Sequence, residues 1–485
     1  MQSKDYIFNP KNYYNRRNKM KLKLQFIIAA FIALVVYVPV AHGQANLTFS
    51  GGSGAPLATT LTRSVTYTIT NYDCDYDSGF TPYFNFDEVG NPKDDDHREK
   101  TLYIWAGDQE RVRPDFLAVI DFNERSHNYG RVLRTVPIPP PGNVGNEPHH
   151  CHLSADKNIL ACGGLLSLLK GQNSIFFFDV SNARHPKFLF STRASESSIT
   201  DDFLPLPNGG FLVTQMGSAT GGAPGRLVEF DRFLNLKAEY PANPPTDGFN
   251  PHGISADFRR NLMVTSDFLN PVTTLNVWPG DVELRGSLRF WNLEKRKITR
   301  TVFLPEALGS MDVKLIPGDP HGRAVTANMF SGLFYTVDPT DGSVLQSFDA
   351  EDIVPHVDGL PVRGGMVQVL AMPERGDRLI FASFMAGQIV MLDISDPNAF
   401  VQQAIVNLGV GAGPHDIDLT EDDSRLVVTD YFLNQDDFGK IHFEGDHKVH
   451  VIQVTPDTLT LDTRFELDFN TAFKHPARPH GIAMK

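Results

Sequence analysis

The sequence predicts an all-β protein, a seven-bladed β-propeller whose ring is closed by the C-terminal strand. One observation is a strand–turn–strand pattern that recurs about every fifty residues, which is in the range of propeller blades. A second is that polar turns separate short alternating segments, with 39 glycines and 33 prolines spread along the chain. A third is that the last copy of the pattern has a first strand and no hairpin after it.

The clearest copies of the repeat begin with Pro-His. "NPHGISADFRRNLMVTSD" starts at Asn250 and "GPHDIDLTEDDSRLVVTDY" starts at Gly413, and in both an alternating segment, a polar turn and an apolar run follow. "EPHHCHLSADKNILACGG", from Glu147, is a third version, and "RPHGIAMK", from Arg478, repeats only the first strand. Alternation bounded by polar turns is the pattern of half-buried strands, so each complete copy predicts a hairpin.

Fainter copies fill the intervals between the clear ones. They begin at Asp201, Met311 and Gly364, lack the leading histidine, and keep the order of strand, turn and strand. Each unit continues into a third strand, such as "SIFFFDV" or "KVHVIQV". The starts near residues 148, 201, 250, 311, 364 and 413 therefore give six units.

The seventh blade is predicted from two incomplete pieces. "TLYIWAGD" and "DFLAVIDF", within residues 101–122, resemble the later strands of a blade and have no Pro-His strand before them. "RPHGIAMK" is a Pro-His strand without later strands. If the C-terminal strand completes the first blade, the ring closes and no sheet edge stays open. The alternative is some other all-β array.

Several histidines occupy a recurring place in this repeat. The first strand of each propeller blade lines the central channel, so residues at one blade position converge on one mouth of it. Counting back from each hairpin places His150 where His252 stands, and His149 and His152 lie beside it. The histidines predicted to be equivalent are His150, His252, His415 and His480. Either they bind a metal together, or Pro-His is a strand-entry device that bonds to the neighbouring blade.

The residue types narrow the choice of metal. Neutral imidazole suits copper, zinc, iron and nickel, whereas carboxylates suit harder ions. Acids near the histidines either orient the metal ligands or cap turns. These acids are Glu147, Asp257, Asp267, Asp416, Asp418 and Asp430. Calcium is a second candidate ion, because "DCDYDSGF" clusters Asp73, Asp75 and Asp77, although a solvated loop explains that stretch as well.

The chain has three cysteines, Cys74, Cys151 and Cys162. "CHLSADKNILAC" is typical of a tight hairpin that turns at Asp156 and Lys157, which places Cys151 opposite Cys162. A disulfide across the hairpin is one prediction. A free Cys151 thiol beside the histidines is the other, because a shift of one residue would separate the sulfurs.

The N-terminal residues are unlike the rest of the chain. Basic residues precede an apolar run from Phe26 to Val38, and the small residues Ala41 and Gly43 follow, in the order of a secretory signal peptide. We expect a signal peptide over residues 1–43, with Met20 as an alternative start, an extension over 44–100 that packs on the propeller, and the propeller over 101–485. The alternative is an uncleaved anchor.

The expected location and partners follow from this order and from the net charge. The cleaved protein would be periplasmic or secreted, with no stable membrane span. A net charge of −13 argues against nucleic acid or an anionic membrane as a partner.

Distributed segments of the chain resemble the selenium-binding protein family, whose bacterial members include methanethiol oxidase. "FLAVIDFNERSHNYGRVLRTVPIP", "VWPGDVELRGSLRFWNLEKRKITRTVFL", "LIFASFMAGQIVMLDISDP" and "RPHGIAMK" are similar to family segments in order and spacing. His149 and His150 match the paired histidines of the family, while His252, His415 and His480 join them by blade position. The cysteine-rich run that follows these histidines in the family is replaced by "CHLSADKNILAC", and the third unit has "SITDD" without a histidine.

The resemblance implies a seven-bladed propeller and a copper enzyme. For methanethiol oxidase it implies that methanethiol, oxygen and water become formaldehyde, hydrogen sulfide and hydrogen peroxide. The sequence therefore predicts an exported copper oxidase with a small thiol and O2 as partners, and Asp267, Asp430 and Cys151 as candidate catalytic residues. The alternatives are a non-catalytic metal- or ligand-binding propeller, a lactonase and an iron oxygenase. The oligomeric state is left open.

Overall fold

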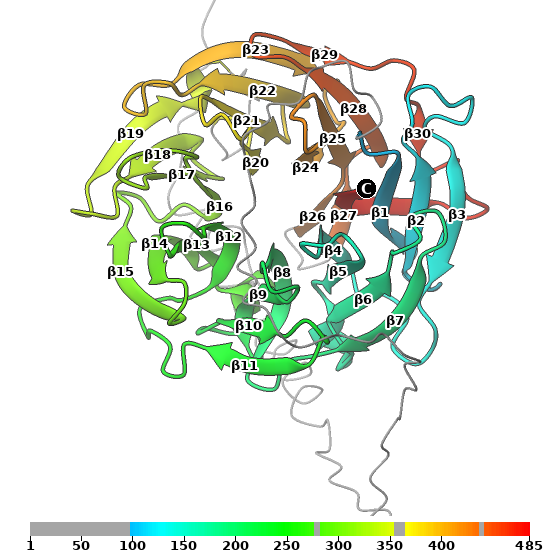
Figure 1. The fold of residues 1–485 in the computed structure, drawn as a ribbon, viewed down its shortest axis with the longest axis horizontal. Helices are drawn as coiled ribbons and strands as arrows, with labels where there is room; N and C mark the ends of the chain where they lie inside the picture. The colour runs from blue at the N-terminus through cyan, green and yellow to red at the C-terminus, as the bar shows by residue number, and fades with distance from the viewer. Residues whose placement is uncertain (1–97, 276–281, 354–363, 436–440) are drawn as a thin grey trace, which may run out of the picture. The chain divides into compact units, whose positions relative to one another are not determined.

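The computed structural model describes residues 98–275, 282–353, 364–435 and 441–485. In this part of the chain seven blades are arranged in a ring, and the regular structure is β apart from short 3-10 turns (Figure 1). No helix among these residues is long and apolar enough to cross a membrane. The predicted signal peptide, nearly all of the predicted extension, and the acidic stretch around Cys74 lie outside the described residues.

Each blade is an antiparallel sheet, whose strands follow one another from the channel outward. Blade 1 contains β31 (Ala477–Met484), β1 (Thr101–Asp108), β2 (Phe116–Asp121) and β3 (Val132–Pro137). Blade 2 contains β4 (Pro148–Leu153), β5 (Ile159–Gly164), β6 (Ile175–Asp179) and β7 (Lys187–Thr192). Blade 3 contains β8 (Ser197–Pro205), β9 (Phe211–Ser218), β10 (Arg226–Phe230) and β11 (Leu236–Tyr240). Blade 4 contains β12 (Pro251–Asp257), β13 (Leu262–Leu269), β14 (Leu284–Asn292) and β15 (Lys297–Phe303).

The remaining blades follow the same order. Blade 5 contains β16 (Ser310–Leu315), β17 (Ala324–Asn328), β18 (Leu333–Val337) and β19 (Val344–Asp349). Blade 6 contains β20 (Val367–Ala371), β21 (Arg378–Ser383), β22 (Gln388–Asp393) and β23 (Val401–Asn407). Blade 7 contains β24 (Pro414–Leu419), β25 (Arg425–Asp430), β28 (Lys448–Val454), β29 (Leu459–Leu461) and β30 (Leu467–Asp468). Outside the blade sheets lie the hairpin β26 (Phe432–Gln435) and β27 (Ile441–Glu444), and the 3-10 turns η1 (Ser167–Lys170), η2 (Pro271–Leu275) and η4 (Ala350–Asp352).

The ring closes between the two ends of the propeller. β31 pairs antiparallel with β1, with Met484 opposite Leu102 and Ala477 opposite Asp108. The label C and the strand β1 lie together in Figure 1. The predicted seven-bladed fold and its closure by the C-terminal strand are therefore confirmed, and each of the six predicted unit starts lies in or just before an innermost strand.

A bulge interrupts the innermost strand of every blade. In blade 2, Pro148 pairs with Gly164 and Cys151 pairs with Cys162, so one extra residue is inserted between the two pairs. The same shift occurs in the other six blades. The first bulge positions are His149, Asp201, His252, Met311, Gln368, His415 and His480. The second bulge positions are His150, Asp202, Gly253, Asp312, Val369, Asp416 and Gly481.

These registers correct one sequence-based prediction. His149, not His150, is the equivalent of His252, because each follows the proline that pairs before the bulge. The count back from the hairpin is wrong by one residue, because it matches Leu160 to Leu262, whereas the pairing registers make Ile159 the equivalent of Leu262. A bulge turns consecutive side chains in new directions, which a simple alternation cannot predict.

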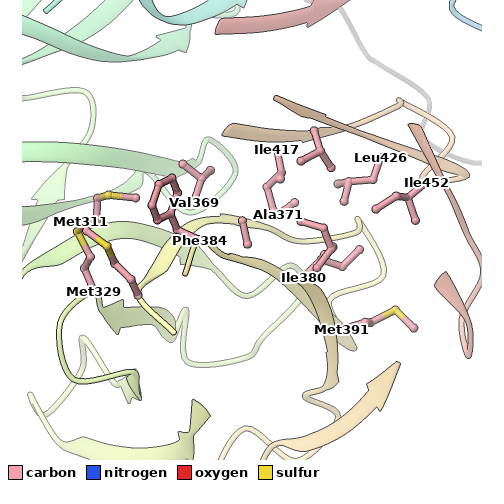
Figure 2. Close-up of a cluster of buried hydrophobic side chains, with 14 of the residues drawn as sticks. Met311, Met329, Val369, Ala371, Ile380, Phe384, Met391, Ile417, Leu426 and Ile452 are labelled. Atoms are coloured by element: carbon pink, nitrogen blue, oxygen red, sulfur yellow. The ribbon is translucent and has the colours of Figure 1, made fainter. Parts of the chain in front are cut away.

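Apolar side chains fill the spaces between blades. Trp105 is fully buried between blades 1 and 2, where its ring centre lies 5.3 Å from that of Phe176 and its Nε1 donates to the Gly163 carbonyl at 2.7 Å. Another cluster extends from blade 3 to blade 7, and the part drawn in Figure 2 has Met311 and Met329 at one end and Leu426 and Ile452 at the other. These contacts fix the inner strands and hence the bulges.

A disulfide joins Cys151 to Cys162, which are opposite residues of β4 and β5. The hairpin register is the one that the sequence predicts. The alternative of a free Cys151 thiol is therefore wrong for this structure.

Candidate metal centre

All five predicted histidines lie together where the innermost strands converge. The ring centre of His149 is 4.2 Å from that of His150 and 4.3 Å from that of His480. The His415 ring is 4.8 Å from His480, and the His252 ring is 6.0 Å from His150. None of the five is more than 8% exposed. Four of them occupy first bulge positions on different blades, and His150 occupies a second position.

Asp201 completes this group and was not predicted. Its Oδ2 lies 3.0 Å from His149 Nε2, and its Oδ1 lies 3.1 Å from His252 Nδ1 and 3.3 Å from His150 Nδ1. It is fully buried and holds the first bulge position of blade 3. The signal is present in "SITDD", since Asp201 follows Thr200 as His149 follows Pro148. Because the unit has no histidine there, the sequence pattern alone did not indicate a ligand.

Neighbouring blades fix the orientation of the histidines. Gln368, at the same position on blade 6, places Oε1 2.8 Å from His415 Nδ1, while its Nε2 donates to the Met366 carbonyl. An accepting Oε1 selects the imidazole tautomer with its proton on Nδ1, which leaves the lone pair on Nε2. The hydroxyl of Thr214, on β9, donates to the His252 carbonyl at 2.7 Å. The hydrogen bond to the neighbouring blade thus uses the backbone carbonyl of His252. The His252 ring stays free to face the other histidines.

Burial lowers the pKa of four of the five histidines. It lowers the pKa of His149, lowers that of His252 to about 4, and holds those of His415 and His480 well below the usual value. These rings are therefore neutral near pH 7 and can act as metal ligands. His150 is different.

Burial also opposes charge on His150, but two carboxylates outweigh it. Asp416, 3.9 Å away, and Asp201 together raise the pKa of His150 to about 10. Burial alone would raise the pKa of Asp201, yet the contacts with His252 and His149 hold it well below the usual range. A charged pair, His150 and Asp201, therefore adjoins the neutral imidazoles.

Several nitrogen atoms of this group have no hydrogen-bond partner among the described residues. They are His149 Nδ1, His150 Nε2, His252 Nδ1 and both ring nitrogens of His480. Buried polar atoms are costly to leave unpaired, so a ligand for them is expected. Ligand atoms of His149, His150 and His480 lie within 4.8 Å of one another, as do those of His149, Asp201 and His252.

This donor set fits a metal ion that prefers imidazole. Copper, iron and zinc have that preference, whereas calcium takes six to eight oxygen atoms. The group offers one carboxylate in direct contact with the histidines at 3.3 Å or less, Asp201. Calcium is therefore a poor fit at this position.

The bulges divide the channel into two chambers with different linings. First bulge residues line an apolar chamber, and second bulge residues line a polar chamber. The apolar chamber includes His149, Asp201, His252, His415, His480, Leu165, Leu168, Leu169, Met216, Phe268, Met311, Met329, Phe330, Met366 and Tyr431. The polar chamber includes His150, His152, Asp202, Asp312, Lys314, Asp416 and Asp418.

The candidate catalytic residues do not join the histidines. Asp267 accepts from Arg289 Nε at 2.7 Å, and Asp430 lies 2.7 Å from His450 Nε2. Neither carboxylate lines a chamber. Cys151 does line the polar chamber, but its sulfur is bonded to Cys162.

The other predicted acids have mixed roles. Glu147 lines the apolar chamber, accepts from Arg478 Nη2 at 2.9 Å, and is bonded by the Tyr431 hydroxyl. Asp257 caps a turn by accepting from the backbone N–H groups of Arg259 and Arg260. Asp416 and Asp418 line the polar chamber.

Fold and site together define a seven-bladed propeller with a buried histidine cluster in its channel. Residues 91–485 match the family described as "56kDa selenium binding protein (SBP56)", and the chain belongs to this family. The resemblance predicted from the sequence is therefore confirmed.

Curated relatives carry two names. A methanethiol oxidase from Homo sapiens is 23% identical over 433 residues, which cover 76% of this chain and 89% of that protein. A methanethiol oxidase from Ruegeria pomeroyi is 25% identical and covers 62% of this chain and 72% of its own length. A selenium-binding protein 2 from Mus musculus is 25% identical, with 76% and 89% covered. These names suggest an oxidoreductase with a small-molecule substrate.

Solved structures share the fold. A hypothetical selenium-binding protein from Sulfolobus tokodaii has a TM-score of 0.66 at 17% identity, and the match covers 80% of this chain and 94% of the other. A periplasmic gluconolactonase from Pseudomonas aeruginosa has a TM-score of 0.51 at 11% identity, with 79% and 99% covered. At these identities the similarity shows the propeller alone, because one fold hosts many activities.

Proposed function

We propose that the protein is an exported copper oxidase that acts on a small thiol. The net reaction would be that of methanethiol oxidation, in which the thiol, O2 and water give an aldehyde, hydrogen sulfide and hydrogen peroxide. The observation that carries the proposal is the group of buried, neutral imidazoles, several of whose ring nitrogens have no hydrogen bond among the described residues. The relatives named methanethiol oxidase support the same interpretation.

The ring residues would hold the copper ion. His149, His252, His415 and His480 supply neutral imidazoles, and His150 joins them where it gives up its proton. When bound, copper would lower the pKa of the substrate thiol and provide a path for electrons to O2.

The surrounding residues would orient the histidine rings and shield them from water. Asp201 and Gln368 hold the rings of His149 and His415 by hydrogen bonds, which fixes their orientation before substrate binds. The apolar chamber excludes water from one side of the rings and accepts the carbon part of the thiol. On the other side, His150 and Asp416 face the polar chamber, which His152 also lines.

Export is supported by two independent features. The N-terminal residues have the charged, apolar and small-residue order of a signal peptide. The Cys151–Cys162 disulfide suits an oxidising compartment and is unusual for the cytoplasm.

The first experiment would be elemental analysis with electron paramagnetic resonance on the exported, mature protein. The double variant His252→Ala/His415→Ala is measured beside it, and His321→Ala, at a half-exposed histidine paired with Asp338, is the matched control. We expect stoichiometric copper that the double variant loses and the control keeps, together with thiol-dependent hydrogen peroxide. Iron or zinc in place of copper would contradict the proposed cofactor. If no metal is bound after reconstitution, the histidines have a structural role only.

A further inference from the structure

The apolar chamber opens directly onto the histidines. Six of the seven first bulge residues line it, including the rings of His149, His252 and His480. A thiol whose sulfur reaches these rings must therefore place its carbon skeleton in this chamber or in the polar chamber. The polar chamber contains Asp312, Lys314 and Asp418, so an apolar group gains nothing there.

The chamber is much larger than methanethiol. Its volume is about 220 Å³. An apolar cavity of about 150 Å³, lined by leucine, isoleucine and phenylalanine, is already large enough to bind benzene. Methanethiol has two non-hydrogen atoms and would leave most of the chamber empty. Closely packed interiors tolerate few such voids, so the size favours a larger ligand.

The walls select for apolar chemistry. Leu165 and Leu168 come from the segment around η1, and Phe268 and Phe330 come from blades 4 and 5. The polar wall groups are already bonded within the protein. Glu147 is bonded to Arg478 and by the Tyr431 hydroxyl, and Thr274 donates to the Pro271 carbonyl at 2.7 Å. A sugar or a lactone would find few hydrogen-bonding partners above the histidines, whereas a hydrocarbon would be well accommodated.

Methionines make the walls adaptable. Met216, Met311, Met329 and Met366 all line the chamber. Figure 2 shows Met311 and Met329 together near Phe384 at the end of the cluster. Thioether side chains fit irregular shapes and contact aromatic rings favourably. Such a wall suits a flat aromatic group better than a single methyl group.

We infer that the substrate is a hydrophobic primary thiol of about the size of benzyl mercaptan, with its aromatic or branched alkyl group in the apolar chamber. This inference rests on the proposed thiol oxidation. One molecule each of benzyl mercaptan, O2 and water would give one each of benzaldehyde, hydrogen sulfide and hydrogen peroxide. One C–H bond and the C–S bond of the carbon next to sulfur break, and a C=O bond forms with oxygen from water. The carbon loses two electrons, and O2 gains them with two protons.

The test compares two thiols on the mature, metal-loaded protein. Sulfide and hydrogen peroxide are measured with methanethiol and with benzyl mercaptan, and calorimetry follows the binding of thiophenol. Thiophenol has no hydrogen on the carbon bonded to sulfur, so it can bind but cannot give an aldehyde. We expect kcat/KM to be at least tenfold higher for benzyl mercaptan, and thiophenol to compete with it.

Two variants test whether the carbon part of the thiol lies in the apolar chamber. Leu168→Trp adds a ring to the chamber wall and should lower the ratio of the two kcat/KM values, benzyl mercaptan over methanethiol, at least fivefold. Leu165→Phe is a smaller change with the same direction, in case the first variant folds poorly. The control is Leu189→Trp on β7, where the side chain is 42% exposed on the outer strand of the same blade. That variant should leave the ratio unchanged.

The outcomes separate this inference from the proposed function. Oxidation of methanethiol with equal or higher kcat/KM than benzyl mercaptan overturns the inference and leaves the oxidase standing. A ratio that Leu168→Trp and Leu165→Phe do not change also overturns it. If the metal-loaded protein oxidises neither thiol, the proposed function itself is wrong.

Discussion

The apolar and polar chambers lie on opposite sides of one ring of bulges, and consecutive residues of each bulge line different chambers. His149 faces the apolar chamber and is neutral near pH 7, whereas its neighbour His150 faces the polar chamber and has a pKa raised to about 10. Both rings are buried. The difference comes from Asp416, which approaches only the second ring closely. Burial alone therefore does not decide the charge of a histidine here, because His150 has a second carboxylate, that of Asp416, in addition to that of Asp201.

The acids of the polar chamber also tie the blades together. Asp202 accepts from the Ile254 N–H at 3.2 Å, and Asp312 accepts from the Leu370 N–H at 2.9 Å. Each bond joins a second bulge residue to the next blade around the ring. In the apolar chamber the corresponding walls meet through side-chain packing. Hydrogen bonds also join blades on the apolar side, as between Gln368 and His415, so the two sides differ in the side-chain packing that the apolar side adds.

The largest expected effect comes from the disulfide that follows the bulge of blade 2. Cys151→Ala/Cys162→Ala should lower the free energy of unfolding by about 2–4 kcal/mol, because the unfolded chain regains conformational freedom. Urea denaturation of the variant measures this, with Cys74→Ser as the control for loss of a thiol. An unchanged stability would mean that β4, which supplies one histidine to each chamber, is held by packing alone.

Asp201 and Asp202 offer a direct comparison of the two chambers. Asp201→Asn should weaken copper binding by about 10–100-fold, because it removes the charge next to three histidines. Asp202→Asn, one residue later and facing the polar chamber, should change the affinity less than threefold. Competition titration with a copper chelator gives both values. Equal losses in the two variants would show that the chambers are not electrostatically separate.

Lys314 is the lysine of the polar chamber, with its Nζ 3.0 Å from Asp312. On metal-free protein, Lys314→Met should cost about 1 kcal/mol at pH 9, because the side chain is partly exposed and the pair is screened. Burial raises the pKa of Asp202 to about 6, so the loss should shrink at pH 5, where this acid is protonated. Lys297→Met, at an exposed position of β15, is the control and should show no pH dependence.

The last prediction concerns the pH dependence that Asp418 causes. Burial and the neighbouring Asp416 raise its pKa to about 8, so the folded protein keeps a proton that the unfolded chain loses above about pH 4. Stability therefore falls as pH rises from about 4 to 8, and Asp418→Asn removes that fall. We expect the free energy of unfolding of the variant to rise relative to that of the wild type as the pH increases from 5 to 9. Thermal melting across this range would contradict the prediction if the two curves stayed parallel.

The fold could be predicted because a repeated hairpin with a Pro-His start is a long-range signal. The gathering of the histidines could be predicted, since they share a motif that can be counted along the chain. Asp201 was missed because one acid in a strand looks like many others. The error over His150 arose from matching Leu160 to Leu262, and only the pairing registers reveal that Ile159 is the equivalent residue. The apolar chamber could not be predicted, because Leu168, Met329 and their neighbours come from loops and strands of different blades.

The closing strand has a consequence for the order in which the protein is made. His480 enters the histidine cluster on β31, and the neighbouring Arg478 donates to the Asp108 carbonyl across a sequence separation of 370 residues. A chain still emerging from the ribosome therefore lacks one of its imidazoles until every other blade has been synthesised. The proposed metal could therefore be held by all five imidazoles only after the ring has closed.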